Sequence, residues 1–173
     1  MAQKTQTPLS WSTPNLDLIK LGDDSKIPTG DPDWINLPTP VQDSTVLTPT
    51  AGERMEAPIE GGALEAVLYK RNTYEFRFEI RALKGRNKPV EDFDGVVSGE
   101  YALRLTPMDP TNKGIQIDRM TMRMEQTWSA TDGEKWLYIC SVLAPVDGTE
   151  QVKPYLAPTA TDPDPDPDPD PIG

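Results

Sequence analysis

Strict alternation of apolar and polar residues is the clearest pattern in the chain, and it runs from residue 73 to residue 83. Because successive side chains of a strand point to opposite faces, this period of two predicts a strand with one buried face. Residues 96–106 alternate in the same way and predict a second such strand. The expected buried side of the first strand consists of Tyr74, Phe76, Phe78, Ile80 and Ala82.

A longer strand is expected at residues 114–128, where the apolar phase changes once. Ile115 and Ile117 occupy odd positions, whereas a row of methionines occupies even positions. One extra residue in one strand of a pair shifts the phase in this way, so we expect a β-bulge near residues 118–119. We interpret the methionine row as a core face, with a subunit contact as the alternative. Its members are Met120, Met122 and Met124.

An Asp-Gly pair at residues 132–133 follows this strand and predicts a hairpin turn. The returning strand, residues 135–143, carries apolar residues at both parities, which predicts cover on both of its faces. Its Cys140 is the single cysteine of the chain, and we expect it to be a small buried side chain.

Shorter elements are predicted in the first sixty residues. Apolar positions favour brief strands at residues 16–21, 34–37 and 44–48. Residues 53–57 are charged and precede a proline, which favours an extended backbone.

Residues 63–70 fit two patterns. Leu64, Val67 and Leu68 match a helical stripe, and the alternate positions match a strand face. We favour a strand that turns at residues 70–73 into the next strand, while a short helix stays open as the alternative.

These elements predict a mainly β fold: an antiparallel β-sandwich or half-barrel with at most one short helix. We divide the chain into an extended N-terminal arm (1–15), a β-rich assembly domain (16–157) and a disordered acidic tail (158–173). The tail contains five consecutive Asp-Pro pairs, which cannot bury apolar surface.

Charge and composition narrow the function. The chain has no histidine and a formal net charge of −11. The missing histidine excludes a Ser-His-Asp triad, a Cys-His pair and a His-bearing zinc site within the chain. The acidic balance disfavours adhesion to nucleic acid phosphates and to anionic membranes. We therefore expect a protein that is not an enzyme.

The acidic clusters predict turns and no defined chemistry. Glu91, Asp92 and Asp94 lie in a Gly-bearing loop without the cleft that paired-carboxylate catalysis needs. Residues 23–25 and 31–33 do not match the spacing of a Ca²⁺ loop, and no glycine fingerprint for phosphates is present. We expect no cofactor and no metal.

Membrane insertion is not expected either. The longest apolar run is far shorter than the roughly 20 residues that span a bilayer. The first residues lack the apolar core of a signal peptide, so we expect synthesis and assembly in the cytoplasm of the producing cell.

Several features follow one another in order between residues 33 and 145. They are Trp34–Leu37, residues 43–48, the charged stretch 52–62, the alternating segments 74–82 and 97–105, residues 114–119, and the Asp132-Gly133 turn. This order resembles the tail tube (major tail) proteins of long-tailed bacteriophages. The resemblance implies a β-sandwich or half-barrel with one short helix. Such subunits close a hexameric ring, and rings stack into a tube through which DNA passes.

The resemblance also implies partners and a location. The partners are other copies of the chain, in ring and stacked-ring contacts, and other virion proteins. DNA is a non-adhering cargo, because an acidic lumen repels phosphates. The protein is expected in the virion, after assembly in the host cytoplasm. Our candidate lumen-facing residues are Glu53, Glu56, Glu60, Glu75 and Glu79. The alternative is a capsid decoration, neck or adhesion β-domain that binds another protein or a glycan.

Overall fold

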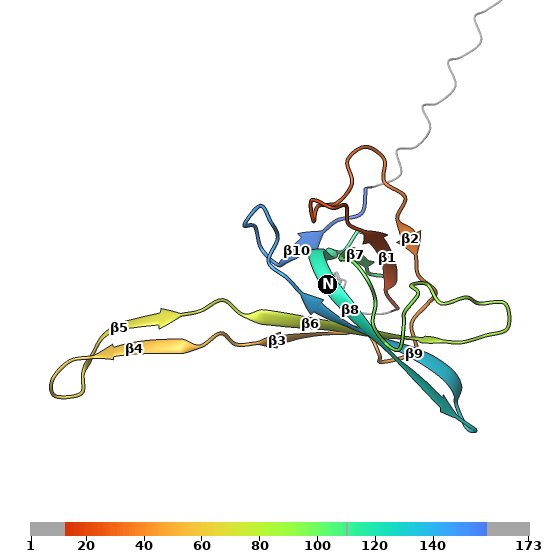
Figure 1. Ribbon diagram of the computed structural model, residues 1–173. Coiled ribbons are helices and arrows are strands. Elements are labelled where there is room, and N and C mark those ends of the chain that lie inside the picture. Colours follow the sequence, from red (N-terminus) through yellow and green to blue (C-terminus); the bar gives the residue numbers. More distant parts are fainter. Residues whose placement is uncertain (1–12, 110, 159–173) are drawn as a thin grey trace, which may run out of the picture.

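The computed structural model describes residues 13–109 and 111–158, and all regular structure in them is β. An antiparallel sheet of eight strands forms the body, and a two-stranded sheet extends from it (Figure 1). The prediction of a mainly antiparallel β fold is therefore confirmed. The short helix implied by the family resemblance is absent from the described residues. The expectations for the first twelve residues and for the Asp-Pro tail lie outside them.

The described residues contain strands near each segment predicted to be extended, and one further strand, β10, that was not predicted. The strands are β1 (Asn15–Lys20), β2 (Ile35–Asn36), β3 (Val46–Thr50), β4 (Arg54–Pro58), β5 (Leu64–Tyr69), β6 (Thr73–Arg81), β7 (Tyr101–Thr106), β8 (Gly114–Ser129), β9 (Gly133–Val142) and β10 (Val152–Tyr155). Residues 63–70 are thus a strand and not a helix, as we favoured.

The large sheet has the order β2-β1-β7-β8-β9-β6-β3, and β10 also pairs with β8. The first part of β8 pairs with β7 and β10, and its later part pairs with β9. Leu18 of β1 and Phe78 of β6 are far apart in the strand order, yet both are fully buried in one core. The sheet therefore curls around a shared interior, which is the half-barrel form of the predicted fold.

The predicted bulge is present in β8. Tyr101 pairs with Met120 and Leu103 pairs with Ile117, so β8 contains one more residue than β7 between these pairs. The extra residue lies at positions 118–119 and rotates the strand's inward face. Both Ile117 and Met120 consequently point into the core and are completely buried.

The strongest alternation produced the most regular element. Phe76, Phe78 and Ile80 of β6 are buried, as predicted. The ring of Phe78 stacks on Tyr138 of β9 with centroids 5.1 Å apart. Cys140 is also fully buried in β9, which confirms that expectation, and burial raises the pKa of its thiol.

Cover on both faces of β9 is only partly realised. On the side away from the core, Ile139 is buried and lies in register between Arg77 and Arg123. On that same side Leu137 is half-buried.

The second alternating segment forms a shorter strand than predicted. We expected residues 96–106, but β7 begins only at Tyr101. Gly95 and Gly99 have φ values of 85° and 90°, and Asp94 has a φ of 47°. Left-handed backbone at these positions is incompatible with a continuous strand, so the chain turns before β7 starts.

The hairpin turn predicted at residues 70–73 is wrong. β5 pairs with β4 while β6 pairs with β3, so the chain runs straight through residues 70–72. The reversal lies instead at residues 59–63, where Gly61 and Gly62 have φ values of 95° and 85°. Only glycine adopts such angles without strain, and two of them in succession permit the tight turn.

Candidate assembly surface

A long two-stranded ribbon leaves the body and is the most unusual feature of the molecule. We name residues 51–72 the β4–β5 arm; it consists of β4, the turn at 59–63 and β5. It continues the β3–β6 pair outward, away from the curled sheet (Figure 1, yellow). Every residue from 53 to 73 is exposed, so the arm lacks a core within the described part of the chain.

One face of the arm is apolar. Residues directly opposite each other in an antiparallel pair project from the same face. Met55 lies opposite Leu68, and Ala57 lies opposite Ala66. The arm exposes six large apolar side chains: Met55, Ile59, Leu64, Val67, Leu68 and Tyr69. Met55 and Leu68 lie on the apolar face, whereas Val67 and Tyr69 lie on the opposite one. Exposed apolar side chains gathered on one small element mark an interaction surface.

The other face is mixed. Arg54 lies opposite Tyr69, and Glu56 lies opposite Val67. Arg54 and Glu56 form an exposed salt bridge of 2.6 Å. Because solvent-exposed ion pairs contribute little, this contact does not explain why the arm is ordered.

The base of the arm depends on one glycine. A Cβ on Gly52 would lie 2.1 Å from the backbone oxygen of Lys70, so no larger residue fits between the two chain segments. The amide of Gly52 donates to Asn72 Oδ1 at 3.2 Å, and the amide of Lys70 donates to the Glu53 carbonyl at 2.9 Å. These bonds join the arm to the β3–β6 pair where the regular ladder is interrupted.

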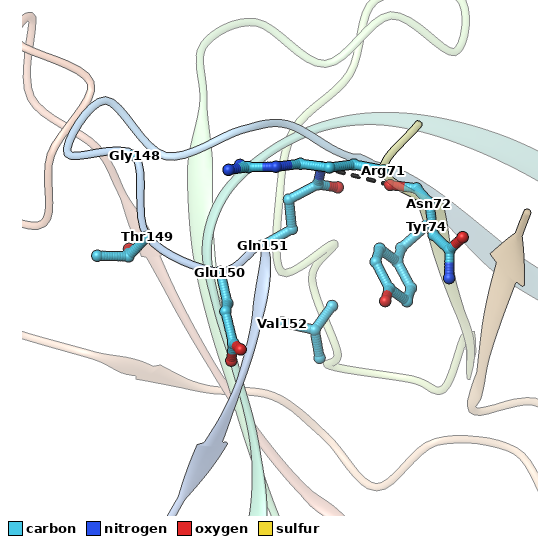
Figure 2. A pocket seen from close by; sticks show the side chains of 8 residues that line it. All are labelled: Arg71, Asn72, Tyr74, Gly148, Thr149, Glu150, Gln151 and Val152. Carbon is cyan, nitrogen blue, oxygen red and sulfur yellow. Dashed lines mark hydrogen bonds between the residues drawn. The ribbon is translucent and has the colours of Figure 1, made fainter. Parts of the chain in front are cut away.

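A polar hollow of about 530 Å³ lies beside this base. Figure 2 shows that Arg71 and Asn72 of the arm line it together with Glu150 and Gln151, which precede β10. Gln151 Nε2 donates to the Asn72 carbonyl at 3.4 Å. Its Oε1 is buried and has no hydrogen-bond partner within the described residues. The hollow therefore holds several hydrogen-bonding groups.

The candidate lumen-facing acids lie along one continuous ribbon. Glu53 and Glu56 are on the arm and Glu60 is in its turn, while Glu75 and Glu79 are on β6. Glu53 pairs with Lys70 at 2.5 Å, and Glu75 pairs with Arg77 at 2.5 Å. Glu79 is half-buried and pairs with Lys135 at 3.3 Å, which raises the pKa of that lysine. The five acids therefore lie along one continuous ribbon, and the structure does not gather them into a cluster.

The methionine row belongs to the core. Met120, Met122 and Met124 are 0%, 5% and 4% exposed and pack with the main hydrophobic cluster. The core interpretation is confirmed, and these side chains offer no free surface to another subunit.

Sequence reasoning missed the apolar residues of the arm. A signal was present, because the Gly61-Gly62 pair separates two short segments of strand character. Treating that pair as a hairpin turn places Met55 opposite Leu68 and exposes their common face.

The acids at residues 91–94 form an ordinary turn, as expected. Asp92 accepts hydrogen bonds from Lys88 and from the Gly95 amide, each at 2.9 Å, and these bonds lower the pKa of its carboxyl.

In the part of the chain that the structure describes, no three potential metal ligands come together, and no helix is long and apolar enough to cross a membrane. No family model matches the chain, and no curated protein matches it.

Proposed function

We propose that the chain is a structural subunit that assembles with copies of itself, in the manner of a phage tail tube protein that forms stacked rings. The observation that carries the proposal is the exposed apolar face of the β4–β5 arm. An isolated two-stranded hairpin is marginally stable in water, and three or more strands or a packing partner are normally needed. A neighbouring subunit would supply that partner.

Unpaired strand edges support the same proposal. Within the described residues, β4 and β5 pair only with each other, and β2 and β3 are the two ends of the large sheet. Such edges attract other strands unless they are protected. Head-to-tail contacts that close into a ring leave none of them free.

The acidic charge of the chain supports the proposal that these subunits form a tube with an acidic lumen. The chain is strongly acidic, with a net charge of −11, and acids recur along the arm and β6. A lumen lined by carboxylates would let DNA slide without adhering, because like charges repel. We propose the virion as the location and other virion proteins as the further partners, on the strength of the resemblance.

The test is size-exclusion chromatography combined with negative-stain electron microscopy of the purified chain. We expect rings or tubes at high protein concentration. Leu68→Ser on the apolar face of the arm should prevent their formation. Leu156→Ser is the matched control, because Leu156 has a similar exposure outside the arm, 57% against 64%. A chain that stays monomeric at high concentration would refute self-assembly. Binding of that monomer to capsid, neck protein or glycan would favour the alternative β-domain function.

A further inference from the structure

The β4–β5 arm and a basic loop lie at opposite ends of β6. The arm ends where β6 begins, at Thr73, and the loop begins where β6 ends, at Arg81. Extended residues rise about 3.3 Å each, so this nine-residue strand separates the two by roughly 30 Å. Figure 1 shows the arm and the loop on opposite sides of the body. They cannot meet within one chain.

The tip of the arm is acidic and apolar. We define the tip as residues 56–65, which contain three glutamates and no lysine or arginine. In the described structure, neither Glu60 nor Glu65 forms a salt bridge. Ile59 and Leu64 lie beside them and are exposed. The tip therefore presents uncompensated negative charge next to apolar side chains.

The first part of the loop at the other end has the complementary charge. We define the far loop as residues 83–95; its first part contains Lys84, Arg86 and Lys88, and its second part contains Glu91, Asp92 and Asp94, so the positive charge is confined to the first part. Leu83 is 53% exposed and adjoins the basic residues, whereas Phe93, 82% exposed, lies between two aspartates. The first part of the loop thus presents positive charge beside one exposed apolar side chain.

The far loop is also held in place and is hollowed. Arg86 Nη1 donates to the Arg81 carbonyl at 2.8 Å, and Lys88 bonds to Asp92 at 2.9 Å. A hollow of about 560 Å³ lies beside the second part of the loop, where Asp92 and Asp94 line it together with Lys88 and Phe93. Lys84 is exposed and forms no salt bridge to any described residue. A preformed surface of this kind loses little conformational freedom on binding.

We propose that the arm tip of one copy docks on the far loop of a second copy. Glu60 and Glu65 face Lys84 and Arg86, and the apolar side chains at the tip cover Leu83. The inference rests on the proposed self-assembly and names the surface that receives the arm. Because donor and acceptor surfaces differ and lie at opposite ends, the contact is head-to-tail and repeats from copy to copy. A two-fold pairing of tips would instead place acid against acid.

Charge reversal tests the contact. We expect Glu60→Lys with Glu65→Lys to raise the protein concentration needed for assembly at least tenfold, measured by light scattering at low salt. Lys84→Glu with Arg86→Glu should do the same. The variant that carries all four changes should assemble again, because the attraction is restored with opposite signs. An equimolar mixture of the two double variants should also assemble.

Matched controls separate a local contact from net charge. Asp23→Lys with Asp31→Lys alters the net charge as much as the tip variant does, and Lys20→Glu with Lys26→Glu matches the loop variant; all four residues are exposed. Both controls should assemble like the wild type. Circular dichroism and thermal unfolding establish that each variant is folded.

Cross-linking provides a second measurement. The double variant Glu60→Cys with Lys84→Cys should give a ladder of linked chains with a short bismaleimide, since the native Cys140 is buried. Glu60→Cys with Lys26→Cys should give none.

These experiments distinguish a failure of the proposed function from a failure of this inference alone. A wild-type chain that never assembles overturns both the proposed function and this inference. A wild-type chain that assembles while the tip and loop variants assemble equally well, or while the fourfold variant stays inactive, overturns only the inference.

Discussion

Arg119 donates two hydrogen bonds to the carboxylate of Glu100, from Nε at 2.9 Å and from Nη2 at 2.8 Å. Arg119 lies in the bulge of β8, and Glu100 immediately precedes β7. A third donor, Arg119 Nη1, reaches the Ala144 carbonyl at 3.2 Å. The extra residue that shifts the face of β8 is therefore tied to both neighbouring segments by one side chain.

This pair predicts a pH-dependent stability. The hydrogen bonds from Arg119 lower the pKa of Glu100 from 4.5 to about 2. Because the folded pKa lies below the unfolded one, the stabilisation is present above pH 4.5 and fades as the pH falls toward 2. We expect Glu100→Gln to lower the free energy of unfolding at pH 7 by about 1 kcal/mol. Urea unfolding should show this difference shrinking between pH 5 and pH 2. A difference that stays constant with pH would contradict the assignment.

Truncation of a core methionine should be costly. Met120 is completely buried, so Met120→Ala leaves a cavity and should lower the free energy of unfolding by about 2–5 kcal/mol. Met108 is 74% exposed, and Met108→Ala should change it by less than about 0.5 kcal/mol. Chemical denaturation of both variants makes the comparison. Equal effects would mean that the methionine row is not part of the core.

The hydroxyl of Tyr138 should contribute to stability through one bond. It donates to the Val90 carbonyl at 3.0 Å, and burial raises the pKa of Tyr138 to about 12. Tyr138→Phe keeps the stacking on Phe78 but leaves a carbonyl acceptor without its partner, so we expect a loss of about 1–2 kcal/mol. Tyr69→Phe on the exposed arm is the control and should be neutral. The measurement is thermal unfolding of both variants by circular dichroism.

The single cysteine should be chemically silent in the folded protein. Cys140 is fully buried and its pKa is raised, so little reactive thiolate forms. We expect a thiol-reactive dye to label it only after denaturation. Its neighbour Ser141 is exposed, and a Ser141→Cys variant should gain one rapidly labelled thiol without denaturant. Rapid labelling of the native wild type would show that β9 opens readily.

Predictions from the sequence succeeded where the cause was local. The alternation in β6, the phase change in β8 and the Asp-Gly turn before β9 were each visible within a few neighbouring residues. They failed where the pairing partner of a strand depends on residues distant in sequence. β5 pairs backward with β4, and nothing within residues 64–69 distinguishes that pairing from a forward one with β6.

The sequence by itself determined the β class, the inward faces of β6 and β8, the bulge and the burial of Cys140. These follow from side-chain periodicity and hydrophobicity, which act on neighbouring positions along one strand. Only the tertiary structure decided that the sheet curls around one core and that β4 and β5 project from it. It also placed the acidic tip and the basic first part of the far loop at opposite ends of β6. Those features depend on contacts between residues distant in sequence, and their free energies compete across the whole fold.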